Sequence, residues 1–123
     1  MFKIRPGKPT DLGFVVETMV RKLLPAYKTM PRDQYWTWMK ARANRLAGRS
    51  DIIVACAKDD EDTILGWLML EKRCIHFVYV RPDVRQSFGV EDALLKYVTG
   101  ADCYSHKTLK ELKKLPWRPD LAE

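Results

Sequence analysis

Apolar residues recur at helical spacing in three stretches of the chain, at residues 12–24, 31–49 and 90–98. Such spacing is typical of amphipathic helices that bury one face. The stretches end at residues that stop helices, namely Pro25, Gly48 and Gly100. The pattern therefore predicts three helices that cover a core.

Between the helices lie nearly unbroken apolar runs at residues 52–57, 64–70 and 75–80, separated by short polar turns. Short turns indicate antiparallel neighbours, and unbroken runs indicate a sheet covered on both faces. Two shorter runs predict strands near residues 2–5 and 102–105, and a short basic helix follows at residues 108–115. We expect a single domain over residues 1–123. Its class is α+β (α/β), in the order β-α-α-β-β-β-α-β-α, with a central, mostly antiparallel mixed sheet flanked by helices.

Composition favours an ordinary globular protein, with 46% hydrophobic and 31% charged residues. No apolar run has the length of a membrane span, and residues 1–8 lack the apolar stretch of a signal peptide. We therefore expect a cytoplasmic location and no membrane partner. The three cysteines form no C-x-x-C pair, so we expect reduced thiols and no metal site.

The net charge of +6 is concentrated in the first half of the chain. Residues 31–49 combine aromatic and basic side chains, which is typical of a face that binds nucleic acid. The alternative is a helix that covers the sheet with its aromatic residues and leaves its basic side in water. The side chains concerned are Tyr35, Trp36, Trp38, Lys40, Arg42 and Arg45.

A polar turn at residues 81–89 joins the third apolar run to the last amphipathic helix. The unpaired N–H groups and the dipole of a helix N-terminus bind phosphate. Arg85 would add a charged fork, and Gln86 and Ser87 would add neutral donors. The alternative is an ordinary turn with a surface arginine.

The element order and this strand-turn-helix unit resemble the GNAT superfamily of N-acyltransferases. That family has an Arg/Gln-x-x-Gly-x-Gly/Ala loop after its central strand. Here Arg85 stands at the first motif position, Phe88 and Val90 replace the two small residues, and Gly89 is offset by one. The chain is also short at its C-terminus compared with the family. Small phage-encoded GNAT-like proteins share its early helices and a Leu-Gly-Trp strand.

The resemblance implies a protein that uses acetyl-CoA, or another acyl-CoA, to acylate a primary amine on a small molecule, a protein or a nucleobase. In the family, the central strand diverges from its neighbour, and its exposed backbone binds the pantetheine arm and polarises the thioester. The resemblance thus assigns cofactor binding to the end of the strand and the following turn, with Val80 the first choice. Dimers are common among small members. The residues assigned are Tyr79, Val80, Arg85, Gln86, Ser87, Phe88, Gly89 and Val90.

Candidates for proton transfer are few. His106 follows Tyr104 where the family's next strand ends near the acceptor, so we predict His106 as base and Tyr104 as acid. His76 lies in the central strand, where simple alternation places it on the face of Val78 and Val80, and a hydrogen-bonded core histidine is the alternative. Tyr97 is a second candidate acid. The resemblance also offers Glu17 and Glu71 as bases, by analogy with family members that use a carboxylate, but Glu71 sits at a predicted turn, where a solvated charge is the favoured interpretation.

The second reading of the sequence is a GNAT fold without catalysis. Phe88 in place of a glycine and the short C-terminus favour it. Such a protein would bind nucleic acid, through residues 31–49, or another protein, in phage DNA modification or virion assembly.

Overall fold

The computed structural model describes residues 2–84, 89–98, 100–105 and 118–122. Within them, five strands form one sheet in the order β1-β2-β3-β4-β5. The strands are β1 (Phe2–Pro6), β2 (Asp51–Ala57), β3 (Asp60–Glu71), β4 (Cys74–Val80) and β5 (Cys103–Tyr104). The helices are α1 (Leu12–Leu23), α2 (Arg32–Gly48) and α3 (Val90–Tyr97), with 3-10 turns at Pro9–Asp11, Leu24–Tyr27 and Pro119–Ala122.

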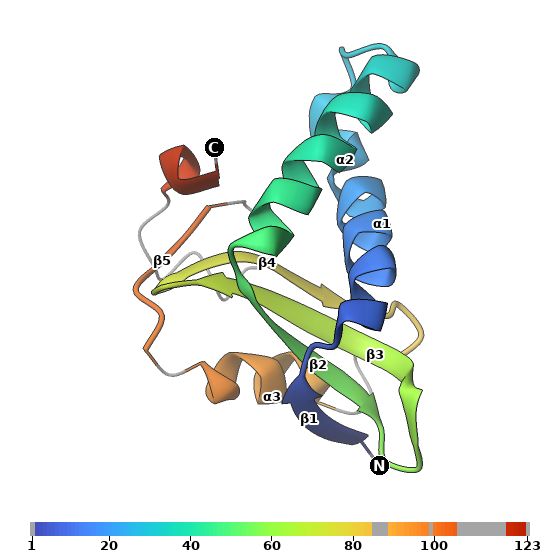
Figure 1. Ribbon diagram of the computed structural model, residues 1–123, viewed down its shortest axis with the longest axis vertical. Coiled ribbons are helices and arrows are strands. Elements are labelled where there is room, and N and C mark those ends of the chain that lie inside the picture. Colours follow the sequence, from blue (N-terminus) through green and yellow to red (C-terminus); the bar gives the residue numbers. More distant parts are fainter. Residues whose placement is uncertain (1, 85–88, 99, 106–117, 123) are drawn as a thin grey trace.

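Neighbouring strands are antiparallel from β1 to β4, and β5 runs parallel to β4. Helices α1 and α2 cover one face of the sheet and α3 covers the other, and the far ends of α1 and α2 project beyond the sheet (Figure 1). The α+β (α/β) class and the mostly antiparallel mixed sheet are confirmed. The helix expected at residues 108–115 lies outside the described residues.

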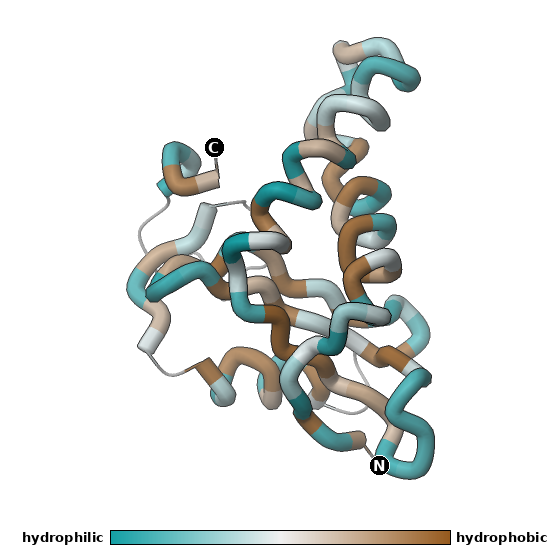
Figure 2. Tube along the Cα trace, in the orientation of Figure 1, coloured by the Kyte–Doolittle hydropathy of each residue, from teal (hydrophilic) through white to brown (hydrophobic). Residues whose placement is uncertain are grey.

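The hydrophobic core has a layer on each face of the sheet, because every residue of β4 is buried. Hydrophobic residues fill the strand centres and the inward side of α1, whereas the β2–β3 turn is hydrophilic (Figure 2). On the α1 face, Trp67 stacks between Phe77 and Tyr79. Its indole N–H donates to the hydroxyl of Thr18 at 2.9 Å. This bond joins the sheet to α1 and gives the buried indole donor the partner that it needs.

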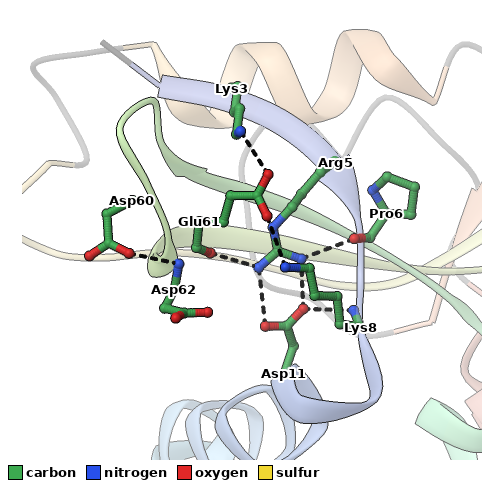
Figure 3. A network of polar contacts seen from close by, with 8 residues as sticks. All are labelled: Lys3, Arg5, Pro6, Lys8, Asp11, Asp60, Glu61 and Asp62. Atoms are coloured by element: carbon green, nitrogen blue, oxygen red, sulfur yellow. Dashed lines mark hydrogen bonds and ion pairs between the residues drawn. The ribbon is translucent and has the colours of Figure 1, made fainter.

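A buried ion pair fixes the start of the chain to the β2–β3 hairpin (Figure 3). The Arg5 guanidinium donates to both oxygens of the Asp11 carboxylate, at 2.7 and 3.1 Å, and to the Glu61 carbonyl at 2.9 Å. Asp11 also accepts from the backbone N–H of Lys8 at 2.7 Å. Hydrogen bonds from Arg5 hold the pKa of Asp11 below its ordinary value despite burial, so the carboxylate stays charged.

Replacing Asp11 with alanine should strongly destabilise the fold, because the Arg5 charge would remain buried without its partner. Breaking such a pair costs about 3–5 kcal/mol of unfolding free energy, measured by urea denaturation. The control Asp83→Ala removes a carboxylate whose partner is the exposed Arg81 and should change stability little. An Asp11→Ala protein as stable as the control variant would contradict the role of the pair.

Candidate functional site

The outer edge of β4 presents backbone groups that β3 does not use. The two strands pair from Cys74 opposite Glu71 to Val80 opposite Gly66, and the next N–H, of Arg81, donates to the Leu65 carbonyl at 2.8 Å. Residues of an antiparallel pair alternate between bonding to the partner and facing away from it. Counting back from Arg81, the N–H and C=O groups of Val80 and Val78 face away from β3.

Strand β5 covers only the beginning of this edge. It pairs with Cys74 and Ile75, and the last bond runs from the N–H of Ser105 to the Ile75 carbonyl at 3.0 Å. Beyond Ile75, no strand among the described residues pairs with the outer edge of β4. We call this edge, at residues 77–80, the β4–β5 opening.

A β-bulge lies where the opening begins. Met69 is opposite Phe77 and Leu70 is opposite Ile75, so His76 is an extra residue in β4. The bulge turns His76 toward Arg42 of α2 and Arg49, which follows α2, and both act on its imidazole, whereas Val78 and Val80 pack on the α3 face. The expectation that His76 shares the face of Val78 and Val80 is therefore wrong, because simple alternation fails at a bulge.

His76 belongs to a buried polar network. Its Nε2 lies 2.7 Å from Glu71 Oε1, and its Nδ1 lies 2.6 Å from Ser105 Oγ. The same Glu71 oxygen accepts from Arg49 Nε at 2.9 Å. His76 is thus a buried, hydrogen-bonded histidine, as the alternative interpretation held, and Glu71 is not the solvated charge expected from its turn position.

The pKa values of the network follow from burial and these bonds. Burial lowers the pKa of His76 below its ordinary value, although Glu71 opposes this. Burial acts to raise the pKa of Glu71, but the bonds from His76 and Arg49 outweigh it, so the pKa lies below its ordinary value. Near neutral pH, a neutral imidazole therefore faces an ionised carboxylate.

Two glycines lie at the far end of the opening. A Cβ on Gly66 would lie 2.7 Å from the Tyr79 carbonyl and 3.1 Å from Val90 Cγ1, so only glycine lets β3, β4 and α3 approach this closely. Gly89 caps α3 in the left-handed conformation, with φ 67°. Gly89 is offset by one residue from the glycine of the family loop, and in the structure it is the residue that caps the start of α3.

The structure places the described candidate residues as follows. The side chain of Tyr79 packs against Phe14 of α1, with ring centroids 5.9 Å apart, and Val90, the first residue of α3, is fully buried. Tyr104 is buried in the core on the α3 face, opposite Ile75. Candidates Arg85, Gln86, Ser87, Phe88 and His106 lie outside the described residues.

The basic stretch at residues 31–49 forms α2. Its apolar stripe is buried, as its spacing predicts, and Tyr35 donates its hydroxyl to the Val20 carbonyl. The Arg42 guanidinium lies over the ring of the half-exposed Trp38, 5.3 Å from its centroid. Nucleic-acid binding through α2 stays a prediction.

Two cavities lie elsewhere on the described part of the protein. A cavity of about 570 Å³ borders Glu71, Cys74 and Cys103, and one of about 640 Å³ lies near Gly7 and Tyr97, away from the β4–β5 opening.

Burial, together with Cys103, raises the pKa of Cys74 to about 12, which makes it a poor nucleophile. The described residues contain no group of three or more metal-ligating side chains, and none of their helices is long and apolar enough to cross a membrane.

The network and its partners were missed from sequence because they come from four separate elements. Arg49 follows α2, Glu71 ends β3, His76 lies in β4 and Ser105 follows β5. No spacing joins them. The one available signal was that Glu71 ends one apolar run and His76 lies inside the next. Polar groups in such positions need partners when they are buried.

The fold is that of the GNAT acetyltransferases, as comparison with solved structures shows. A putative acetyltransferase from Pyrococcus furiosus superposes with a TM-score of 0.63 at 17% identity, over 89% of this chain and 85% of that one. Apo YjaB from Escherichia coli gives a TM-score of 0.60 at 18% identity, over 80% of this chain but only 64% of YjaB. PaiA N-acetyltransferase from Thermoplasma acidophilum, in complex with coenzyme A, gives 0.50 at 15% identity, over 79% of this chain and 69% of that one. The sequence matches no protein-family model and no curated protein.

The buried neutral His76 should make stability depend on pH. Its pKa is lower in the folded than in the unfolded chain, so stability is full above about pH 6.5 and falls as the unfolded histidine takes up a proton. The slope from this group cannot exceed about 1.4 kcal/mol per pH unit. Urea denaturation between pH 7.5 and 5.5 should show a smaller loss for His76→Gln than for the wild type. Equal losses would mean that His76 keeps its ordinary pKa in the folded protein.

Proposed function

We propose that the protein is an acyl-CoA-dependent N-acyltransferase that transfers acetyl from acetyl-CoA to a primary amine. The observation that carries the proposal is the β4–β5 opening, where Val78 and Val80 direct backbone N–H groups away from the sheet. The GNAT fold supports it, and so does the coenzyme A bound to one protein of that fold.

The residues of the opening fit an acyl-CoA. Its pantetheine arm is an extended chain with two amides, and a strand edge that no described strand pairs offers matching donors and acceptors. Acetyl-CoA supplies an activated thioester, and the Val80 N–H is the donor that would polarise its carbonyl. A fixed backbone donor stabilises negative charge that develops on oxygen as an amine attacks.

The pyrophosphate would lie at the start of α3. Gly89 begins this helix in the left-handed conformation, and the first-turn N–H groups, Val90 among them, point out of its N-terminus. By resemblance, Arg85 supplies charge, and Gln86, Ser87 and Phe88 complete the turn. Glu91 and Asp92 in the first turn favour the helix dipole but oppose an anion, so the arginine matters more here.

Acetyl-CoA should bind saturably and stabilise the protein, by about 2.7 kcal/mol when its concentration is a hundred times the dissociation constant. Val80→Pro removes the outward N–H while leaving the ladder to β3, and should weaken binding about fivefold, since one hydrogen bond contributes about 1 kcal/mol. Val80→Ala keeps the N–H and is the matched control. Calorimetry measures both.

Two outcomes would count against these assignments. Equal affinity of the proline and alanine variants would remove the Val80 N–H from the site. No stabilisation of the wild type at millimolar acetyl-CoA would refute the acyltransferase proposal and leave a binding module as the function.

Arg85→Ala should weaken acetyl-CoA binding about tenfold or more, because a charge-assisted hydrogen bond to phosphate contributes about 1.5–3 kcal/mol. The loss should be smaller at high salt, where screening already weakens the wild-type contact. Arg73→Ala is the control, since Arg73 is an exposed arginine at the other end of β4 that pairs with Asp102. An unchanged dissociation constant for Arg85→Ala would exclude Arg85 from the pyrophosphate site.

A further inference from the structure

The described arginines divide into two groups by their partners. Those outside α2 each pair with a carboxylate, namely Arg5, Arg21, Arg49, Arg73, Arg81 and Arg118. The arginines within α2, at positions 32, 42 and 45, have no carboxylate partner among the residues that the structure describes. Residues 31–49 hold five Lys/Arg and one Asp/Glu, so this helix carries much of the net charge of +6 and neutralises little of it within the chain. Its charge is open to an anionic partner.

Three side chains of α2 form a stripe on one face of the helix. Trp38, Arg42 and Arg45 are spaced i, i+4 and i+7, and residues with this spacing lie one above another along a helix. Tyr35 and Met39 are fully buried, so the stripe lies beside the core and not in it. Arg45 is exposed, and 36% of the Trp38 surface is exposed. We call these three residues the α2 stripe.

Trp38 and Arg42 form a stacked pair in the stripe. The guanidinium lies over the indole, and its Nε is buried without a hydrogen-bond partner among the described residues, so the ring and not a carboxylate holds it in place. A guanidinium is a planar fork that matches phosphate, and an exposed indole is a surface on which a nucleobase stacks. The neighbouring aromatic residues are not available for stacking, because Tyr35 is fully buried and Trp36 packs against the core.

We propose that the α2 stripe binds single-stranded nucleic acid, with Arg42 and Arg45 on phosphates and Trp38 against a base. Binding at the stripe needs no acyl-CoA, so it is a function beyond the proposed acyltransferase activity and does not rest on it.

The chemistry of the stripe favours nucleic acid over an acidic protein surface. A nucleic-acid strand alternates phosphates with flat bases, so it offers a partner to both the charges and the exposed indole, whereas the carboxylates of an acidic peptide leave the indole without one. The bases of a duplex are stacked on one another, which favours a single strand. At about 1.5 Å per residue the stripe is about 10 Å long, the length of about three nucleotides at about 3.4 Å each.

The first test measures the charged contacts. Fluorescence anisotropy follows the binding of a labelled oligodeoxythymidine, about fifteen nucleotides long, to the full-length chain between about 50 and 200 mM salt. Affinity should fall with salt. Arg45→Ala should reduce the slope of log affinity against log salt by about 0.7, the value for one phosphate contact on a single strand, and Arg45→Lys should keep the slope.

Arg73→Ala is the matched control for the charge. It also removes an exposed arginine, but one that pairs with Asp102 and lies far from α2 in the chain. The control should keep the affinity and the salt slope of the wild type.

The second test measures the contact with a base. Trp38→Ala should weaken binding about tenfold with little change in salt slope, because base stacking contributes affinity without charge, and Trp38→Phe should keep most of the affinity. An abasic strand of the same length should bind the wild type about tenfold more weakly than the oligodeoxythymidine does. The abasic strand and the oligodeoxythymidine should bind Trp38→Ala equally, since the ring that distinguishes them is gone.

Four outcomes would overturn the proposal. They are a wild-type protein that does not bind the strand at the lowest salt, Arg45→Ala with the slope of Arg73→Ala, an abasic strand that binds the wild type as tightly as the oligodeoxythymidine, and a polyglutamate of equal charge that displaces the strand at equal concentration. The last outcome would identify an acidic protein as the partner. Acetyl-CoA that fails to bind would refute the acyltransferase proposal and leave this one standing.

Discussion

The unequal pairing of β4 is the constraint on which the rest of the site depends. Strand β4 is bonded to β3 over its whole length, whereas its other edge pairs, among the described residues, only at Cys74 and Ile75. A strand paired along the rest of this edge would use the N–H groups of Val78 and Val80. Because no described strand does so, a strand buried on both faces still has polar backbone to offer a ligand.

The bulge at His76 belongs to the same geometry. An extra residue bends a strand and increases its twist, and here it stands directly after the two residues of β4 that pair with β5. It also changes the direction of one side chain. His76 turns to Glu71 and Arg49 instead of entering the apolar layer under α3, so a buried imidazole finds the partners that its burial requires.

Much of the rest of the molecule holds this region in place. Gly66 in β3 brings the end of β4 and the start of α3 together, and its neighbour Trp67 joins β3 to α1. The Arg5–Asp11 pair fixes the opposite edge of the sheet to the β2–β3 hairpin. A site on a strand edge needs such support, because its donors are precise only if the backbone that carries them is rigid.

The sequence by itself determined the elements, their order and the burial of both sheet faces, because hydrophobic periodicity is local and helix and strand repeats differ. It also directed attention to Val80 and to Gly89, through a resemblance in strand order. It could not show that the described pairing of β4 with β5 lies at Cys74 and Ile75, that His76 sits in a bulge, or that Glu71 and Ser105 meet the same imidazole. Those facts depend on strand register and on contacts between residues far apart in the chain, such as Glu71, His76 and Ser105. A shift of one residue in register reverses which side chains face which layer, and only the packed tertiary structure decides it.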